Sequence, residues 1–135
     1  MREIDKIIVH CTATAEGRDV SVDEITRWHK EQGYATIGYH YVVSLDGKVY
    51  SGRGEHRIGA HCLGHNASSI GVVYVGGLTK SGKPKDTRTP AQKKALLSLL
   101  RELREKYPKA SIHGHNEYSN KACPCFDAYN EYKTL

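Results

Sequence analysis

The chain has 135 residues and a net charge of +5 at neutral pH, with 39% hydrophobic and 26% charged residues. These values are typical of one folded domain that can bury a core without disulfides, and they exclude a disordered or fibrous protein. No segment approaches the roughly 20 apolar residues that span a bilayer, and the basic residues are spread along the chain, so we expect neither membrane insertion nor nucleic-acid binding.

The N-terminal segment lacks the apolar core and cleavage site of a secretory signal. We therefore expect a monomer that is made in the cytoplasm and that needs another factor to release it if its substrate lies outside the membrane. Disulfides are rare in such proteins, so the cysteines are expected to be thiols or metal ligands. They are Cys11, Cys62, Cys123 and Cys125.

The first predicted elements are a strand and a helix. The apolar run at residues 4–9 predicts a buried strand that ends at His10. Ser21 and Glu24 form a capping box, and apolar residues then recur at helical spacing. Gly33 is expected to end this helix.

Several strands follow the helix. Residues 39–44 predict a strand, Asp46-Gly47 a hairpin turn, and residues 48–51 the returning strand. A short strand is expected at residues 59–61. The continuous β-branched run at residues 70–75 predicts a central strand of the sheet.

The C-terminal half begins with a polar loop over residues 76–87. Thr89, Pro90 and Gln92 then supply the N-cap, the first turn and the capping box of the clearest helix. A last strand is expected at residues 110–113, and the tail at residues 127–132 predicts a short helix. This order predicts an α/β fold, in which residues 1–135 form a single domain with a central mixed β-sheet flanked by helices.

Candidate metal ligands lie at the ends of the predicted strands. His10 follows the first strand, His115 follows the last, and the loop to Cys123 is long enough to fold back. Two imidazoles and a thiolate suit Zn²⁺, and three ligands leave a fourth position for water, whose pKa zinc lowers toward about 7. On the residues alone, His10 could equally be a core histidine and Cys123 a buried thiol. A structural zinc that uses Cys123 and Cys125 also stays open.

Eight stretches resemble, in the same order, the zinc-dependent N-acetylmuramoyl-L-alanine amidase family, which includes small phage amidases and peptidoglycan recognition proteins. Together they cover nearly the whole chain, and the phage branch is the most similar. The stretches are Val9-His10-Cys11-Thr12-Ala13-Thr14, Arg27-Trp28-His29-Lys30-Glu31-Gln32-Gly33, Gly38-Tyr39-His40-Tyr41, Gly59-Ala60-His61, Ser69-Ile70-Gly71-Val72, Val75-Gly76-Gly77, Thr89-Pro90-Ala91-Gln92 and Lys121-Ala122-Cys123-Pro124.

The resemblance implies roles for particular residues. It makes His10, His115 and Cys123 the zinc ligands, and it makes Tyr39 and Lys121 catalytic residues. Lys121 could help zinc to stabilise the developing oxyanion, and Tyr39 could position water or shuttle its proton. On the residues alone, Tyr39 could also be a packed aromatic and Lys121 a surface lysine.

The resemblance also places His61 and Asn66 beside the substrate groove, where they are expected to contact substrate. Four other residues receive weaker expectations. His40 is interpreted as structural, Cys11 as core, and His113 as a possible neighbour of the zinc ligands. Cys125 departs from the serine-like residue usual in the family and receives no role.

The implied function is zinc-dependent hydrolysis of the amide between N-acetylmuramic acid and L-alanine in bacterial peptidoglycan, as in a phage or prophage endolysin. Three alternatives are a peptidoglycan-binding module without activity, a regulator of a phage RNA polymerase, and a hydrolase with Cys123 as nucleophile. The intact ligand set argues against the first. The polymerase-binding member of the phage branch has a longer N-terminal segment than this chain, which argues against the second.

Overall fold

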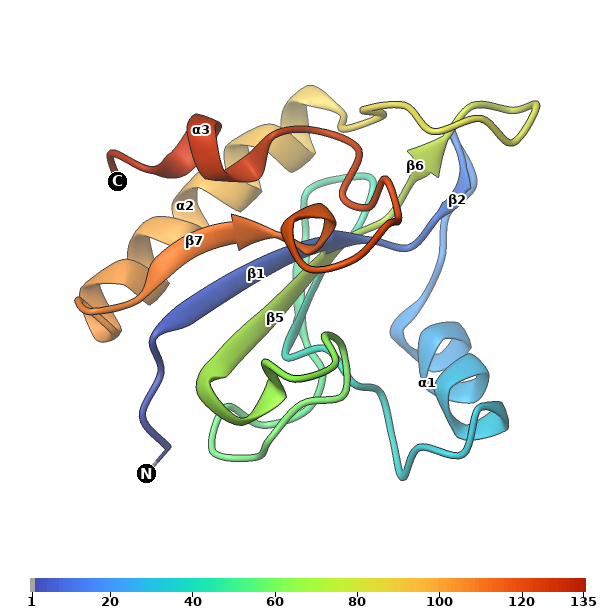
Figure 1. Cartoon of the computed structure of the whole chain (residues 1–135). Coiled ribbons are helices and arrows are strands. Elements are labelled where there is room, and N and C mark those ends of the chain that lie inside the picture. Colours follow the sequence, from blue (N-terminus) through green and yellow to red (C-terminus); the bar gives the residue numbers. More distant parts are fainter. Residues whose placement is uncertain (1) are drawn as a thin grey trace.

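Parallel strands form most of the central sheet. In the computed structural model, which describes residues 2–135, β5 (Ser69–Tyr74) is the middle strand. It pairs in parallel with β1 (Lys6–Cys11) on one side and with β3 (Tyr41–Val43) on the other. The outer strands are β7 (Ser111–Gly114), parallel to β1, and β4 (Val49–Ser51), antiparallel to β3. The expected mixed sheet with a central β5 is therefore confirmed (Figure 1).

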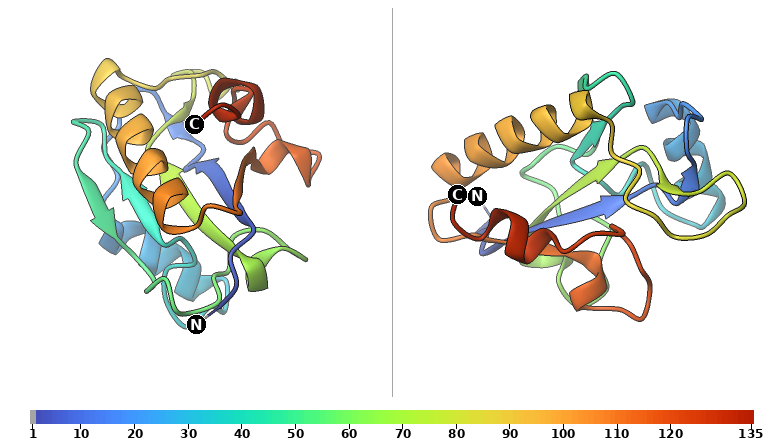
Figure 2. Two further views of the ribbon diagram at one scale, coloured as in Figure 1. Left: turned by 90° about the vertical axis from the view of Figure 1, so that its left-hand side faces the viewer. Right: turned by 90° about the horizontal axis from the view of Figure 1, so that it is seen from above.

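Helices cover the two faces of this sheet unequally. Helices α2 (Pro90–Lys106) and α3 (Ala128–Tyr132) lie over one face, and α1 (Val22–Glu31) lies by the other (Figures 1 and 2). The apolar residues form two clusters accordingly, a larger one with the leucines of α2 and a smaller one with Ile25 of α1. The sequence therefore forms the α/β domain with a mixed sheet flanked by helices that its element order predicts.

Strand β1 contributes side chains to both faces because successive residues of a strand alternate. Ile7, Val9 and Cys11 pack in the larger cluster beneath α2. His10 points to the opposite face and is 1% exposed. This alternation confirms that Cys11 is a core residue, and it directs His10 toward the side of the sheet where α1 lies.

Small elements complete the chain. The 3-10 helices are η1 (Asn66–Ser68) and η2 (His115–Glu117). Strands β2 (Thr14–Ala15) and β6 (Gly77–Leu78) pair in parallel as a separate two-stranded sheet. This pairing falls partly inside the predicted polar loop at residues 76–87, and two-residue strands are too short to leave a pattern in the sequence.

The helix caps agree with prediction at α2 and differ in part at α1. Thr89 and Gln92 make the complete capping box, and the Gln92 amide also donates to Val75 O at 2.9 Å. At α1, Ser21 accepts from the Glu24 N–H, but the Glu24 carboxylate pairs with Arg18 at 2.9 Å. The reciprocal half of the predicted α1 box is thus replaced by an ion pair.

Two strand predictions need correction. The strand expected at residues 59–61 does not form, because this segment is held by the single backbone bond from Ala60 N–H to Gly38 O and by side chains. The strand predicted at 39–44 is shorter, so Tyr39 lies just before β3. Among residues 2–135, the helices lack the combination of length and apolar character needed to cross a membrane.

Candidate metal centre and groove

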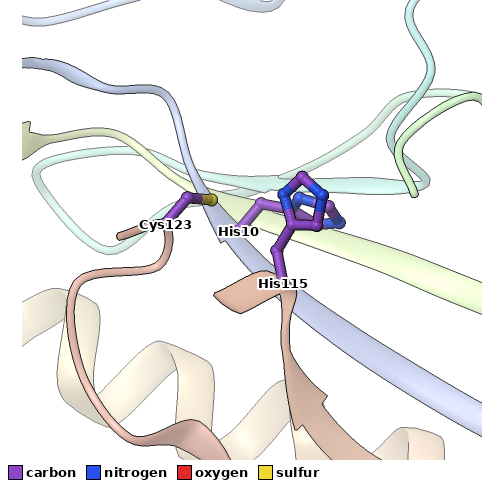
Figure 3. A group of neighbouring side chains, drawn as sticks. All are labelled: His10, His115 and Cys123. Carbon is purple, nitrogen blue, oxygen red and sulfur yellow. The ribbon is translucent and has the colours of Figure 1, made fainter. Parts of the chain in front are cut away.

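Two imidazoles and one thiol converge beside the C-terminal end of β1 (Figure 3). His10 lies on β1, His115 begins η2, and Cys123 lies in the loop between η2 and α3. Their donor atoms all lie within 4.8 Å of one another, and in the part of the chain that the structure describes no fourth His, Cys, Asp or Glu joins them. Two nitrogens and a sulfur are a donor set that fits zinc, with one coordination position left for water or substrate.

Burial keeps both imidazoles of this cluster in the form that binds metal. Burial, aided by His61 and His115, lowers the pKa of His10 well below the usual value. Burial and the nearby Lys121 also lower the pKa of His115. A neutral imidazole offers a nitrogen lone pair to a cation, whereas a protonated one does not.

The thiols of Cys11 and Cys123 have pKa values that are shifted in opposite directions. The Cys11 backbone N–H donates to Cys123 Sγ at 3.2 Å. The thiol and the backbone N–H of Cys11 lower the pKa of Cys123, whereas the contact with Cys123 and burial raise the pKa of Cys11. Cys123 is therefore the member of the pair that becomes a thiolate, the form that binds metal.

The loop that carries Cys123 is fixed by contacts to the sheet. The buried Tyr74 hydroxyl donates to Pro124 O at 2.6 Å, and the Cys125 thiol donates to Gly77 O at 3.2 Å. A Cβ on Gly114 would lie 3.0 Å from Pro124 Cδ, so this glycine lets the loop approach β7 closely. These contacts bring residue 123 back to β1 although 112 residues separate it from Cys11.

A groove between α1 and the sheet leads to the cluster. A cavity of about 280 Å³ contains the three donors in its lining, and a cavity of about 460 Å³ continues it past His61 and Asn66. The two cavities share part of their lining. The shared residues are His29, Gln32, Tyr39, His115 and Lys121.

Tyr39 and Lys121 bring different chemistry to this groove. The Tyr39 ring lies 5.1 Å from the His10 ring, measured between centroids. Burial raises the pKa of Tyr39, so its hydroxyl stays protonated and can donate a hydrogen bond. Lys121 is exposed and places a positive charge at the groove beside His115.

His61 and Asn66 both line the groove, but much of their polar capacity is used within the protein. Asn66 Oδ1 accepts from the backbone N–H groups of His61 and Cys62, each at 2.9 Å. His61 Nδ1 lies 2.8 Å from His10 Nε2, and His61 Nε2 lies 3.2 Å from Ser69 Oγ. Burial, followed by the charges of nearby groups such as His40, lowers the pKa of His61 to about 3, so its ring is neutral.

Sequence reasoning missed the contribution of α1 to the groove. Trp28, His29 and Gln32 line the cavity beside the donor cluster. His29 Nδ1 accepts from the Gly38 N–H at 2.8 Å, so its neutral ring carries its proton on Nε2. The available signal was a histidine on the apolar stripe of a predicted helix, a place where an aliphatic residue is usual.

Comparison with known proteins identifies the family of this chain. The sequence profile of the N-acetylmuramoyl-L-alanine amidase family matches residues 1–126. The chain belongs to this family. The endolysin of Enterobacteria phage K11 is 45% identical over 133 residues, which cover 98% of this chain and 88% of that protein. The endolysin of Escherichia phage T7 is 48% identical over 123 residues, covering 91% and 82%.

Solved structures of amidases share the fold. The N-acetylmuramoyl-L-alanine amidase LysC from Clostridium intestinale URNW superposes with a TM-score of 0.83 at 28% identity. The match covers 96% of this chain and 82% of that protein. The predicted family and the predicted α/β fold are therefore both confirmed.

Three remaining residues of this amidase can be placed. His40 is structural, as expected, because its Nδ1 accepts from Gly71 N–H at 2.9 Å and its Nε2 contacts Arg57 O. His113 bonds Ser111 and Glu117 through its two ring nitrogens and stacks on Tyr129, so it does not hydrogen-bond a residue of the donor cluster. Cys125 lies 3.9 Å from Cys11, Sγ to Sγ, and stays outside the cluster.

Proposed function

We propose that this amidase is a zinc-dependent endolysin that cleaves the amide between N-acetylmuramic acid and L-alanine in bacterial peptidoglycan. One observation carries the proposal: in a chain of this family, His10, His115 and Cys123 converge in a groove with no fourth protein donor among the described residues. That arrangement is typical of a catalytic rather than a structural zinc site.

In this proposal, His10, His115 and Cys123 hold the metal, which their donor atoms and spacing support. When bound there, zinc supplies Lewis-acid polarisation of an amide carbonyl and activation of water near neutral pH. The protein's own contribution is to keep both imidazoles neutral and the Cys123 thiol easily ionised, as the shifted pKa values of these groups indicate. Cys123 is thus a ligand in this proposal and not a nucleophile.

Tyr39 and Lys121 are proposed as the catalytic residues. The Tyr39 hydroxyl is protonated and close to His10, so it can orient the attacking water or the scissile carbonyl through a donated hydrogen bond. The Lys121 ammonium stabilises negative charge that develops on the carbonyl oxygen. Both side chains line both cavities, so one substrate amide can meet both.

The second cavity is proposed to hold substrate beyond the scissile amide. Asn66 and His61 line it, and Asn66 fixes the loop through the backbone N–H groups of His61 and Cys62. We propose that the protein acts as a monomer on the cell wall, with peptidoglycan as its macromolecular partner.

Digestion of purified peptidoglycan tests this function. The proposal predicts new free amino groups on L-alanine while the glycan strands keep their length, and loss of this product with EDTA and recovery with zinc. Mass spectrometry of the released peptides gives the cleaved bond. Binding without peptide release would indicate a recognition module, and full activity in EDTA with loss on thiol alkylation would indicate a cysteine nucleophile.

A further inference from the structure

The His61 imidazole lies directly behind a proposed zinc ligand. His61 Nδ1 is 2.8 Å from His10 Nε2, and the two rings meet edge to face with centroids 4.9 Å apart. This bond occupies Nε2 of His10, which leaves Nδ1 as its free nitrogen. His61 is not itself a member of the cluster of donors within 4.8 Å, so it is not a fourth ligand.

A second hydrogen bond fixes the direction of the first. His61 Nε2 lies 3.2 Å from Ser69 Oγ on β5. If His10 Nδ1 gives its lone pair to a metal, its proton sits on Nε2 and is donated to His61 Nδ1. The His61 proton is then on Nε2, where Ser69 Oγ accepts it. One arrangement of protons therefore satisfies both hydrogen bonds, from His10 to His61 and from His61 to Ser69.

Two glycines make the space that the His61 ring fills. A Cβ on Gly71 would lie 2.6 Å from both Cγ and Cδ2 of His61, and its three nearest atoms all belong to that ring. A Cβ on Gly59 would lie 2.7 Å from His61 Cδ2. No side chain larger than hydrogen fits at either position while the ring stays where it is, so the surrounding chain is shaped around this imidazole.

We infer that His61 is a positioning residue, which accepts the Nε2 proton of His10 and so orients His10 Nδ1 toward the metal. This role deepens the proposed function and rests on it, because it requires His10 to be a zinc ligand. His61 therefore has no ring nitrogen left to bond substrate, since both nitrogens already have partners within the protein. Groups that orient a metal-binding histidine are worth roughly 10- to 100-fold in metal affinity.

Zinc affinity of the full-length protein, measured by competition with a chromophoric chelator, tests this role without using activity. His61→Leu removes the acceptor and is expected to weaken zinc binding roughly 10- to 100-fold. His61→Asn places an amide oxygen near the position of Nδ1 and is expected to restore most of the affinity. The control His65→Leu changes a histidine of the same loop that packs against the Tyr118 ring, and it should leave affinity within about twofold of wild type.

Gly71→Ala tests the same role with the imidazole unchanged. Its new methyl group would push the His61 ring away from His10, so zinc binding should weaken, whereas in a His61→Ala background the methyl group has room and should cost little more. This pair also decides the question if His61→Leu fails to fold. Thermal unfolding of each metal-free variant identifies any change that acts on folding alone.

The outcomes distinguish the role of His61 from the proposed zinc-dependent function. Zinc binding by His61→Leu or Gly71→Ala within about twofold of wild type would overturn the role of His61 and leave the proposed function standing. Equal losses in His61→Asn and His61→Leu would also overturn it, because packing and not a hydrogen bond would then be responsible. A wild-type protein that binds no zinc would overturn both.

Discussion

Individual residues of the site could be predicted to different degrees. His10, His115 and Cys123 were found from donor chemistry together with a family resemblance, and the structure brings them together. The bond between His61 and His10 could not be predicted, because no periodicity says which loop reaches a ligand 51 residues away. Asn66 fixes the loop through two backbone bonds, a local role that its sequence position does not reveal.

Lys121 is expected to be needed for catalysis but not for zinc binding. Lys121→Met keeps much of the side-chain length but removes the charge that we propose stabilises the developing oxyanion, so kcat should fall by roughly 100- to 1000-fold. Zinc content should not change, because Lys121 is not a ligand. Steady-state kinetics on purified cell wall, with metal analysis of the same samples, measures both.

The matched control for Lys121 is Lys80→Met, an exposed lysine on the loop after β6 and outside both cavities. It makes the same change in net charge. A loss of activity in Lys80→Met as large as that in Lys121→Met would show that overall charge, and not charge in the groove, is responsible.

Elements were predictable where their signals are local. The capping box of α2 and the Asp46-Gly47 hairpin formed as predicted, because each depends on a few adjacent residues. The strand expected at residues 59–61 was wrong because this segment packs around the His61 ring and the groove. Strands β2 and β6 were missed because their pairing joins short segments far apart in the chain.

The buried Tyr74 hydroxyl is one of the contacts that hold the loop between η2 and α3 against the sheet. Tyr74→Phe removes the donor to Pro124 O and should lower the free energy of unfolding by about 1–2 kcal/mol. Because this loop carries Cys123, zinc affinity should also fall. Chemical denaturation and chelator competition measure the two effects. Tyr129→Phe, an exposed tyrosine of α3, is the control, and an equal loss of affinity there would contradict the role of the Tyr74 bond.

Helix α3 is held by the buried Arg88, whose side chain is 2% exposed. The Arg88 guanidinium lies 2.7 Å from Glu131, 2.9 Å from Asp86 and 3.4 Å above the Phe126 ring. The hydrogen bond from Arg88 lowers the pKa of Glu131. A lowered carboxyl pKa contributes stability above the ordinary value near 4.5, and this contribution is lost as the pH falls through the folded-state pKa.

Glu131→Gln should therefore destabilise the protein at pH 7 by about 1 kcal/mol, a small effect because solvent screens the half-exposed carboxylate. The difference from wild type should shrink as the pH drops below the folded-state pKa of Glu131. Urea denaturation across this pH range measures it. Glu105→Gln, at an exposed position of α2, is the control, and a difference that persists unchanged in acid would refute the ionic explanation.

The architecture of the whole molecule follows from the order of strands and helices along the chain. The sequence of strands and helices predicted a mixed sheet with helices on both faces, and the strand order with β5 at the centre agrees. The resemblance implied a substrate groove, but the contribution of α1 to its lining was beyond prediction, since it depends on which residues of that helix face the donors.

The net positive charge of the protein is expected to make its activity on the cell wall depend on salt. With a charge of +5, the protein should be concentrated at an anionic cell wall, and salt should weaken this attraction. Raising the salt from about 50 to 300 mM should therefore lower kcat/KM on whole cell wall while leaving cleavage of a small neutral muramoyl-peptide unchanged. Equal salt dependence on both substrates would contradict this explanation.

Zinc content per chain tests the central claim most directly, in wild type, Cys123→Ala and Cys125→Ala purified in parallel. The two thiols are two residues apart, yet only Cys123 joins the donor cluster. We expect one zinc per chain in wild type and in Cys125→Ala, and almost none in Cys123→Ala, with amidase activity following the metal. Full zinc and activity in Cys123→Ala, or loss of both in Cys125→Ala alone, would contradict the proposed site.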